Sequence, residues 1–279
     1  MPITNAPYIK PFLRWAGGKS WLIKHLDSII GEQKFNNYHE PFLGGGAVFF
    51  YLNHTGTSFL SDLNAELINT YIAIKQSPED VISCLQKYKN TSDDYYEIRN
   101  SHPTTASEVA ARFIYLNQTS YNGLYRVNIK GEYNVPYGNR KKHFLEEDKL
   151  RAASQKLQNA DLSIGDFENV KKNIAQGDLV FLDPPYTVSH NHNGFIKYNK
   201  NLFSLEDQYR LRALIDVIKE NKAYYILTNA AHKTIFEIFY QKTDKYYELS
   251  RASLIGGEKA IRGQIQEYIF TNLQGGSKE

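Results

Sequence analysis

Apolar residues are spaced along this chain in two alternating ways, which together predict an alternation of strands and helices. Short apolar runs of strand length occur six times, at residues 38–42, 58–60, 162–164, 179–182, 224–227 and 267–270. Elsewhere, apolar residues recur every three or four positions, as expected for helices that bury one face. Strands that alternate with helices are typical of a mostly parallel sheet covered by helices on both faces. The fold class expected is therefore α/β.

One helix and two strand–helix steps can be placed near the amino end of the chain, and the first step is the run 38–42, its glycine turn and the apolar run 48–52. Residues 20–30 form an apolar stripe at helical spacing, and we expect Ser20 to cap its start and Gly31 its end. The run 58–60 ends at Ser61-Asp62, and helical spacing begins again at Leu63. An acidic side chain is therefore expected at the carboxyl end of a strand.

The alternation is interrupted between residues 77 and 158. Residues 77–118 are predicted to be mainly helical, and another helix is expected near 146–158. Between them, residues 121–143 mix aromatic, glycine, asparagine and cationic residues, and the apolar pattern on both sides of Gly131 predicts a β-hairpin. We therefore expect one α/β domain made of residues 1–76 and 159–279, with a largely helical module inserted at 77–158.

Composition excludes several classes of protein. The chain is 42% hydrophobic with a formal charge of +3, which permits a polyanionic partner without implying one. The segment Met1 to Lys10 lacks the apolar stretch of a signal peptide, and no apolar run reaches the roughly 20 residues of a membrane span, so a soluble, cytoplasmic protein is expected. The single cysteine, Cys84, excludes an intrachain disulfide framework and argues against cytosine-C5 methylation, which needs a nucleophilic thiol. A buried helical cysteine is the expected role for Cys84.

Two segments fit a nucleoside-containing ligand at the carboxyl ends of parallel strands, where such ligands bind in open α/β sheets. Residues 40–46 form a glycine turn after the first strand, and Asp62 follows about 20 residues later. An acid at that interval suits a ribose diol, whose two hydroxyl groups need acceptors. A purely structural glycine turn is the alternative.

The run Asp183-Pro184-Pro185-Tyr186 follows another apolar run and combines two acceptors with an aromatic face. Each proline fixes φ and removes an N–H, so a neighbouring carbonyl can point at a ligand without internal competition. Asp183 supplies the second acceptor, and Tyr186 offers a surface on which a base can stack. Two acceptors that converge on an exocyclic NH2 favour methylation of an amino nitrogen. The alternative is a proline turn that ends a buried strand.

Two other motifs are similar to a phosphate-binding loop and to a metal site, but neither likeness is sufficient to predict one. Gly17-Gly18-Lys19-Ser20 is similar to the end of a phosphate-binding loop, but that motif needs a glycine where Leu13 stands, and no strand precedes it. This argues against an ATPase. His190 and His192 form a His-x-His pair in a polar segment, where solvated side chains are more common than metal ligands, so we expect no metal.

Five ordered motifs within residues 12–272 resemble the Dam-type, α-group DNA adenine-N6 methyltransferases. The motifs are Phe12 to Lys19, Glu40 to Gly46, Ser61 to Asn64, Tyr121 to Asn128 with Gly131 to Gly138, and Gly165 to Phe167 followed by Asp183 to Tyr186. The resemblance implies a Rossmann-like, S-adenosylmethionine-dependent methyltransferase sheet, with residues 77–158 as the target-recognition domain. It implies direct transfer of a methyl group, with neither a covalent intermediate nor a metal.

The resemblance also assigns roles by position. The catalytic group implied is Asp183, Pro184, Pro185 and Tyr186. The residues implied for S-adenosylmethionine are Trp15, Ala16, Gly17, Lys19, Glu40, Pro41, Phe42, Gly44, Gly46, Asp62, Asp166, Phe167 and Asp183. The residues implied for double-stranded DNA are Arg14, Tyr121, Asn122, Leu124, Arg126, Asn139, Arg140 and Lys141.

Methylation of N6 requires the adenine to leave the duplex. The cations between residues 121 and 151 can follow DNA phosphates, and the loop from Arg251 to Arg262 is expected to touch phosphate as well. The chain departs from the family pattern at Asn139, where an arginine is often found, which affects readout of the outer base pair. The segment Thr187 to Phe203 also differs, and Phe195 or Tyr198 is a candidate to close over the target base.

The resulting hypothesis is a site-specific, adenine-specific DNA methyltransferase that acts on a GAT-containing site, GATC or an asymmetric site such as GGATG. We expect a monomer that belongs to a restriction–modification system. The alternatives are a cytosine-N4 methyltransferase, which usually has serine in place of Asp183, an RNA or protein-glutamine methyltransferase, and a non-catalytic DNA-binding protein on the same fold.

Overall fold

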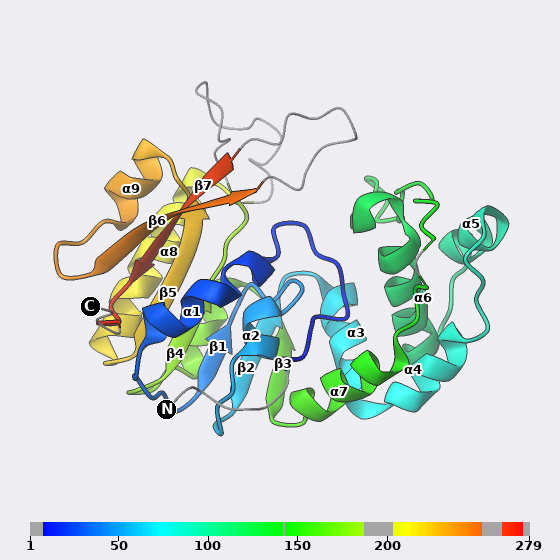
Figure 1. Ribbon diagram of the computed structural model, residues 1–279, viewed down its shortest axis with the longest axis horizontal. Helices are drawn as coiled ribbons and strands as arrows, with labels where there is room; N and C mark the ends of the chain where they lie inside the picture. Colours follow the sequence, from blue (N-terminus) through cyan, green and yellow to red (C-terminus); the bar gives the residue numbers. More distant parts are fainter. Residues whose placement is uncertain (1–7, 142, 187–202, 253–263, 276–279) are drawn as a thin grey trace. The chain divides into compact units, whose positions relative to one another are not determined.

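One seven-stranded sheet runs through the computed structural model, which describes residues 8–141, 143–186, 203–252 and 264–275. The strands are β1 (Tyr38–Glu40), β2 (Ser58–Asp62), β3 (Ala160–Ile164), β4 (Leu179–Leu182), β5 (Tyr224–Ala230), β6 (Lys245–Ala252) and β7 (Gln264–Thr271). Their order in the sheet is β3-β2-β1-β4-β5-β7-β6 (Figure 1). β4 pairs in parallel with both β1 and β5, whereas β7 is antiparallel to β5 and β6. The expected α/β class is confirmed.

The strands alternate with helices over most of the chain. The α-helices are α1 (Ile23–Ile30), α2 (Ala47–Tyr51), α3 (Ala65–Gln76), α4 (Pro78–Leu85), α5 (Ser92–Asn100), α6 (Ala106–Thr119), α7 (Glu147–Leu157), α8 (Leu205–Glu220) and α9 (Lys233–Phe239). Short 3-10 helices are η1 (Lys19–Trp21), η2 (Tyr121–Gly123) and η3 (Phe167–Lys172). The expected helical character of residues 77–118 corresponds to α4, α5 and α6.

Contacts divide the chain into two compact units. The first unit comprises Met1–Ser20, Leu43–Asn53 and Leu60–Asp166, and the second comprises Trp21–Phe42, His54–Phe59 and Phe167–Glu279. This division follows packing alone. The division into a catalytic domain and a recognition domain at residues 77–158 concerns function, and it stays a prediction.

The core of the second unit lies around β4 and β5. Val180 and Leu182 of β4, which alternate along the strand, join a buried apolar cluster with α8 and α9. The intervening Phe181 is only 1% exposed, so β4 is buried on both faces, as is usual for parallel strands. α8 begins at a capping box in which Ser204 and Asp207 satisfy each other's backbone N–H groups.

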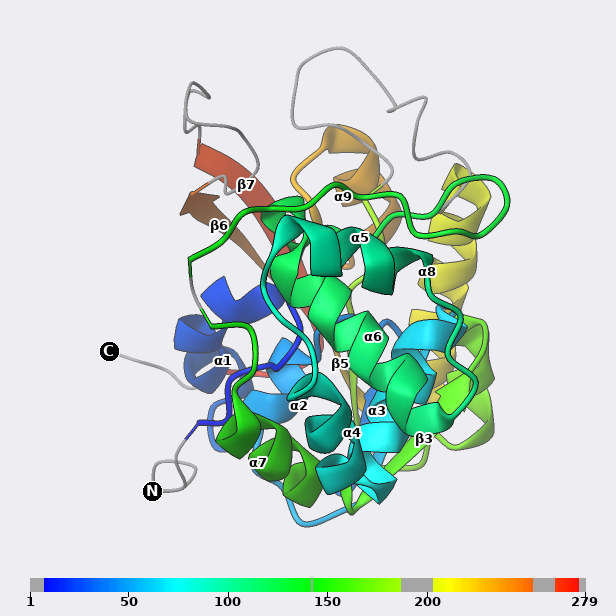
Figure 2. The same ribbon diagram turned by 90° about the vertical axis from the view of Figure 1, so that its right-hand side faces the viewer.

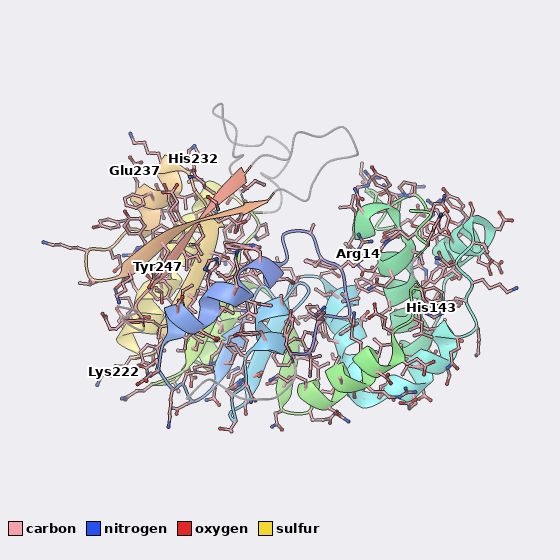
Figure 3. The ribbon with its side chains drawn as sticks, in the orientation of Figure 1. Arg14, His143, Lys222, His232, Glu237 and Tyr247 are labelled. Atoms are coloured by element: carbon pink, nitrogen blue, oxygen red, sulfur yellow. The ribbon has the colours of Figure 1, made fainter. Side chains whose placement is uncertain are left out.

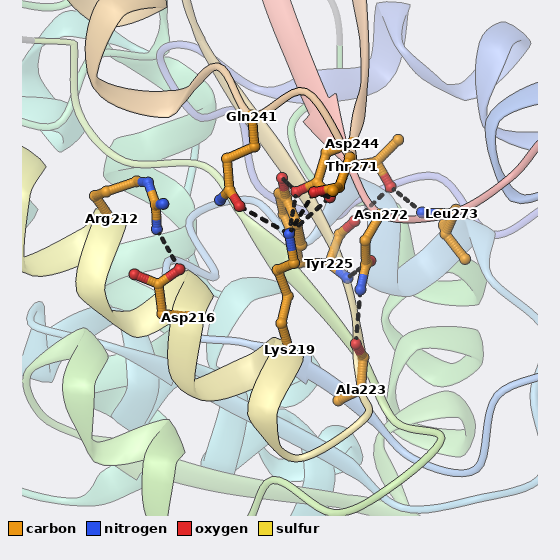
Figure 4. Close-up of polar contacts among 11 residues, drawn as sticks. Arg212, Asp216, Lys219, Ala223, Tyr225, Gln241, Asp244, Thr271, Asn272 and Leu273 are labelled. Carbon is orange, nitrogen blue, oxygen red and sulfur yellow. Dashed lines mark hydrogen bonds and ion pairs between the residues drawn. The ribbon is translucent and has the colours of Figure 1, made fainter.

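A polar network fixes the amino end of β5 in the second unit. Lys219 at the end of α8 donates to the Asp244 Oδ1 atom at 2.7 Å, and the Tyr225 hydroxyl donates to Oδ2 of the same carboxylate at 2.7 Å (Figure 4). Asn272 accepts from the backbone N–H of Tyr225 at 2.9 Å and donates to the Ala223 carbonyl at 2.9 Å. These bonds join α8, β5 and the chain after β7 at the amino end of β5.

Helices dominate the first unit. α6 packs against α3, α4 and α5, and α7 packs against α3 and α4 (Figure 2). An antiparallel bridge between Val127 and Tyr133, closed by a turn in which Gly131 has a φ of +79°, confirms the predicted β-hairpin. Hydroxyl groups dock the chain that leaves this hairpin, since Tyr95 donates to the Val135 carbonyl at 2.8 Å.

Some local expectations were wrong. α1 begins at Ile23, and its N-cap is Leu22 without a side-chain bond, so Ser20 does not cap it. The reason is that residues 19–21 form the separate 3-10 helix η1. At the other end of α1, Gly31, with a φ of +62°, ends the helix as expected. Cys84 lies in α4 but is only partly buried. Among the residues that the structure describes, no helix is long and apolar enough to cross a membrane.

Candidate active site and nucleic-acid interface

The glycine turn and Asp62 are joined by hydrogen bonds within the first unit. The Gly44 N–H donates to the Asp62 Oδ2 atom at 3.0 Å, and the Asn64 N–H donates to Oδ1 at 2.9 Å. Burial raises the pKa of the Asp62 carboxyl, and the N–H donors of Asn64 and Gly44 partly oppose this effect. Each oxygen keeps further lone-pair sites, so the carboxylate is held in place and can still accept hydroxyl donors.

Trp15 covers the glycine turn. A Cβ atom built on Gly44 would lie 2.7 Å from the Trp15 Cδ1 atom, and one on Gly45 would lie 3.2 Å from the Trp15 Cβ atom. The indole also stacks on Tyr125, with ring centroids 5.7 Å apart and planes at 25°. The Tyr125 hydroxyl donates to the Glu66 Oε2 atom at 2.6 Å. Trp15 therefore connects the glycine turn to the first residues of the hairpin.

The segment before Trp15 is fastened to α6. Asn117 accepts from the Arg14 N–H at 2.8 Å and donates to the Arg14 carbonyl at 2.6 Å. The Arg14 guanidinium, labelled in Figure 3, lies against Gly123, where a Cβ atom would be 2.7 Å from it. Its Nη1 atom is buried and has no hydrogen-bond partner within the described ranges, and burial together with the nearby Arg140 charge lowers the Arg14 pKa. Lys19 is buried and donates to the Gly17 carbonyl at 2.7 Å.

In the second unit, two carboxylates follow neighbouring parallel strands. Glu40 is the last residue of β1, and its Oε2 atom accepts from the buried Tyr38 hydroxyl at 2.8 Å. Burial raises the pKa of Tyr38 well above its ordinary value, and the negative charges of Glu40 and Asp183 raise it further. Glu40 at the end of β1 and Asp183 after β4 therefore both lie close enough to the Tyr38 hydroxyl to raise its pKa.

The run that begins at Asp183 is held from two other strands. The Thr228 hydroxyl of β5 donates to the Asp183 Oδ1 atom at 2.7 Å. The Tyr186 hydroxyl donates to the Glu267 Oε2 atom of β7. Thr228 and Glu267 are fully buried, whereas Asp183 and Tyr186 are partly exposed and Pro185 is exposed. Asp183 and Tyr186, which have predicted chemical roles, are thus accessible to a ligand. Thr228 and Glu267, which hold them by hydrogen bonds, are not.

Three phenylalanines pack together in the second unit. Phe42 and Phe167 stack with centroids 5.3 Å apart and planes at 25°, and Phe203 contacts both rings. The Arg210 guanidinium lies 4.8 Å from the Phe167 ring centroid. Phe167 is only 3% exposed, whereas Phe42 is partly exposed, so Phe42 is the more accessible of the two rings predicted to face the cofactor.

The hairpin presents its predicted DNA-contacting side chains to solvent. Tyr121 is 47% exposed and Leu124 is 39% exposed. The exposed Arg126 donates from Nε to the Asn134 Oδ1 atom at 2.7 Å and from Nη2 to the Asn134 carbonyl at 3.1 Å. The opposite strand therefore fixes the plane of this guanidinium before any ligand is bound.

The chain after the hairpin holds the remaining predicted DNA contacts. Asn139 is exposed with a φ of +46°, and Lys141 is exposed. Arg140 is partly buried, and its Nη1 atom donates to the Gln118 carbonyl at 3.3 Å. The Asn90 side chain donates to the Arg140 carbonyl at 2.7 Å, so the backbone here is fixed to the helical part of the first unit.

The family model for D12 class N6 adenine-specific DNA methyltransferases matches residues 15–254. The chain belongs to this family. It is 34% identical to the type II methyltransferase M1.LlaDCHI of Lactococcus lactis subsp. cremoris over 96% of this chain and 97% of that protein. It is also 34% identical to the DNA adenine methylase of Haemophilus influenzae, with 91% of each chain covered. It is 34% identical to the type II methyltransferase M.MjaIII of Methanocaldococcus jannaschii over 84% of this chain and 88% of that protein.

Sequence reasoning missed four side chains that this methyltransferase uses to hold the predicted site residues: Asn117, Asn134, Thr228 and Glu267. Glu267 lies in the run 267–270, which is predicted only to be a strand, and Thr228 directly follows the run 224–227. A polar residue fully buried in a strand is uncommon, but a sequence does not show which polar strand residue is buried.

Several predictions concern residues outside the described ranges. These are the segment 187–202 with Phe195, Tyr198, His190 and His192, and the basic residues of 253–263. Within the described ranges, no three side chains of His, Cys, Asp or Glu come together as metal ligands.

Proposed function

We propose that this chain transfers a methyl group from S-adenosylmethionine to N6 of an adenine flipped out of double-stranded DNA. The observation on which this depends is the accessible Asp183 carboxylate at the carboxyl end of β4, flanked by Pro184 and held by the buried Thr228 hydroxyl. Membership of the D12 family supports the adenine, and the names of the relatives, type II methyltransferases and DNA adenine methylases, support DNA as substrate.

The residues fit the proposed cofactor chemically. Asp62 is a fixed carboxylate with acceptor sites left for ribose hydroxyls, and Phe42 has an accessible aromatic face suited to a purine. Trp15 and Lys19 complete the contacts proposed from the first unit, and Glu40 adds a carboxylate that suits a cationic amine. When bound, the cofactor supplies an electrophilic methyl group on a sulfonium.

The proposed chemistry at the target is a direct displacement. The Asp183 carboxylate and the backbone carbonyl of Pro184 accept the two N–H groups of the adenine amine, which orients the nitrogen lone pair toward the methyl group. Tyr186 supports the base by stacking. With the cofactor bound, N6 would take the methyl group in a single displacement that leaves a thioether, and N6 would then lose one proton to the surrounding water.

Recognition of DNA is assigned to residues 77–158. In the hairpin, Arg126 is suited to guanine because its guanidinium, held by Asn134, keeps donors for a bidentate contact. The exposed Leu124 side chain is the group that we propose makes an apolar contact with a base edge. We propose a target that contains GAT, GATC or an asymmetric site such as GGATG, and a monomeric enzyme. The type II relatives support a role in restriction–modification.

Modification-sensitive sequencing tests the base and the site together. Unmethylated genomic DNA is incubated with the enzyme and S-adenosylmethionine, with Asp183→Ala as the matched inactive variant. The proposal expects N6-methyladenine within one GAT-containing motif and none with the variant. Methyl groups on cytosine N4 would instead establish the cytosine-N4 alternative, and binding of DNA without transfer would establish a non-catalytic protein.

Base flipping has a separate optical test. A duplex with 2-aminopurine at the target adenine should become brighter on binding, because the probe leaves the stack. The same probe at a neighbouring adenine outside the target position is the control. An equal change at both positions would contradict flipping of one base.

A further inference from the structure

Two buried side chains of the second unit contact the run from Asp183 to Tyr186, and neither belongs to the groups proposed to touch a ligand. Thr228 lies in β5, which pairs in parallel with β4, and Glu267 lies in β7, which pairs with β5. Both are 0% exposed. A buried hydroxyl and a buried carboxylate each cost free energy unless they are hydrogen-bonded, so their partners reveal what they do.

The Thr228 hydroxyl fixes one oxygen of the catalytic carboxylate. It donates to the Asp183 Oδ1 atom at 2.7 Å, a distance typical of a charge-assisted bond, and lies 3.5 Å from the Leu182 carbonyl. A hydroxyl has a single proton to donate. Engagement of Oδ1 restricts the plane of the carboxylate that we propose accepts from the adenine amine.

Glu267 fixes the direction of the Tyr186 ring. Stacking on a base needs only the ring, so the phenolic hydroxyl has no required role in the proposed chemistry. That hydroxyl nevertheless donates to the Glu267 Oε2 atom. Because β7 pairs with strands on both sides, the carboxylate is a rigid reference point, and the bond limits rotation of a tyrosine that extends from a loop.

We propose that Thr228 and Glu267 are positioning residues that preset the Asp183 carboxylate and the Tyr186 ring for the incoming adenine. The inference rests on the proposed function, because it concerns the same target base. The free enzyme then has less side-chain freedom to lose when the base arrives, and the benefit appears in the rate of transfer.

The first experiment isolates the Thr228 hydroxyl. Thr228→Val replaces the hydroxyl with a methyl group of nearly the same size, and Thr228→Ser restores it. We expect Thr228→Val to lower the single-turnover rate of methyl transfer by about 10- to 100-fold, the usual effect of losing a bond to a charged group. Thr228→Ser should stay within about threefold of the wild type, because it keeps the hydroxyl donor. Equal rates for the valine and serine variants would overturn this role.

The second experiment is a double-mutant cycle between Glu267 and Tyr186. Tyr186→Phe and Glu267→Met each remove one partner of the bond, and the double variant removes both. If Glu267 acts through the hydroxyl, each single variant slows transfer by about tenfold and the double variant is no slower than the slower single one. Losses that multiply, or a Tyr186→Phe variant at the wild-type rate, would overturn the proposal.

A third variant keeps the test decisive if Glu267→Met does not fold. Glu267→Gln retains an oxygen acceptor for the tyrosine, so its rate should exceed that of Tyr186→Phe. A Glu267→Gln rate at or below that of Tyr186→Phe would count against the proposal.

Activity of the wild-type enzyme distinguishes failure of the proposed function from failure of the positioning roles. If wild-type enzyme places no methyl group on adenine, the proposed function is wrong. If the wild type methylates adenine and the Thr228 and Glu267 variants match it, only the positioning roles are wrong.

Discussion

The indole of Trp15 occupies the space in which any side chain at Gly44 would lie. A Cβ atom at Gly44 would be 2.7 Å from the indole Cδ1 atom, and Gly44 also has a φ of +47°. Two separate reasons therefore require glycine at this position. The backbone has a left-handed conformation, and the indole of Trp15, from the motif Phe12 to Lys19, leaves no space for a side chain. The glycine turn is predicted to lie at the cofactor site, and Trp15 fills the space beside Gly44.

The Gly44–Trp15 contact should be visible as a loss of stability. We expect Gly44→Ala to lower the free energy of unfolding by about 2–4 kcal/mol, since left-handed strain adds to overpacking against the indole. Gly131→Ala is the matched control, because Gly131 has a φ of +79° and nothing within 4 Å of an added Cβ atom, so only strain of about 1 kcal/mol applies. Urea denaturation measures both. Equal losses would show that the indole is not the cause.

Cofactor binding should depend on pH through Asp62. Burial raises the pKa of this carboxyl, and only the ionised form accepts two hydroxyl donors. As pH falls from about 8 to 4, affinity for S-adenosylmethionine should begin to decline above the usual aspartate range. Asp62→Asn should bind about 10- to 100-fold more weakly and lose this dependence. Calorimetric titration measures both effects, with the exposed Asp161→Asn as control. A pH profile unchanged in Asp62→Asn would contradict the assignment.

Stability should fall with acidification because of His39. The His39 Nε2 atom lies 2.8 Å from the Asp178 Oδ2 atom, and the buried Nδ1 atom has no partner within the described ranges. Burial lowers the pKa of His39 despite the nearby carboxylate, so the folded protein holds the neutral ring. The unfolded chain binds a proton first, near pH 6.5, and stability is therefore lost as pH falls from about 6.5 to the lowered pKa.

Chemical denaturation at a series of pH values measures this effect. His39→Gln should flatten the profile in that window, whereas His102→Gln, at an exposed position, should leave it unchanged. A wild-type profile that is flat below about pH 6.5 would rule out this role for His39.

Substitutions at two residues of the hairpin should have different effects, one on recognition of a base and one on binding to phosphate. Arg126 is pinned to Asn134 through Nε and Nη2, a geometry that lysine cannot reproduce, so Arg126→Lys should reduce discrimination at one base pair by about 1–3 kcal/mol. Lys130→Ala, on the exposed turn, should weaken binding to all sequences alike and lower the salt dependence. Binding to a panel of single-base variants at two salt concentrations checks both. A uniform loss in Arg126→Lys would assign Arg126 to phosphate.

Local patterns were sufficient for much of this fold. The order of most strands and helices follows from apolar spacing. Asp183 was found because it directly follows the apolar run 179–182, and Asp62 because the run 58–60 ends at Ser61-Asp62. β6 was missed, because Lys245–Ala252 mixes charged and polar residues as a strand at the edge of a sheet does, and such a run resembles a loop.

The partners of the predicted site residues were decided by tertiary structure. Tyr186 and Glu267 are 81 residues apart in the sequence, and Asp183 and Thr228 are 45 apart. The sequence by itself determined which residues have the chemistry of an amine-methylating site, because those residue types occur at the ends of recognisable strands. Only folding determined what holds each one in place. A hydrogen bond requires two atoms within about 3 Å, and for these two pairs the order and register of the strands bring distant residues that close.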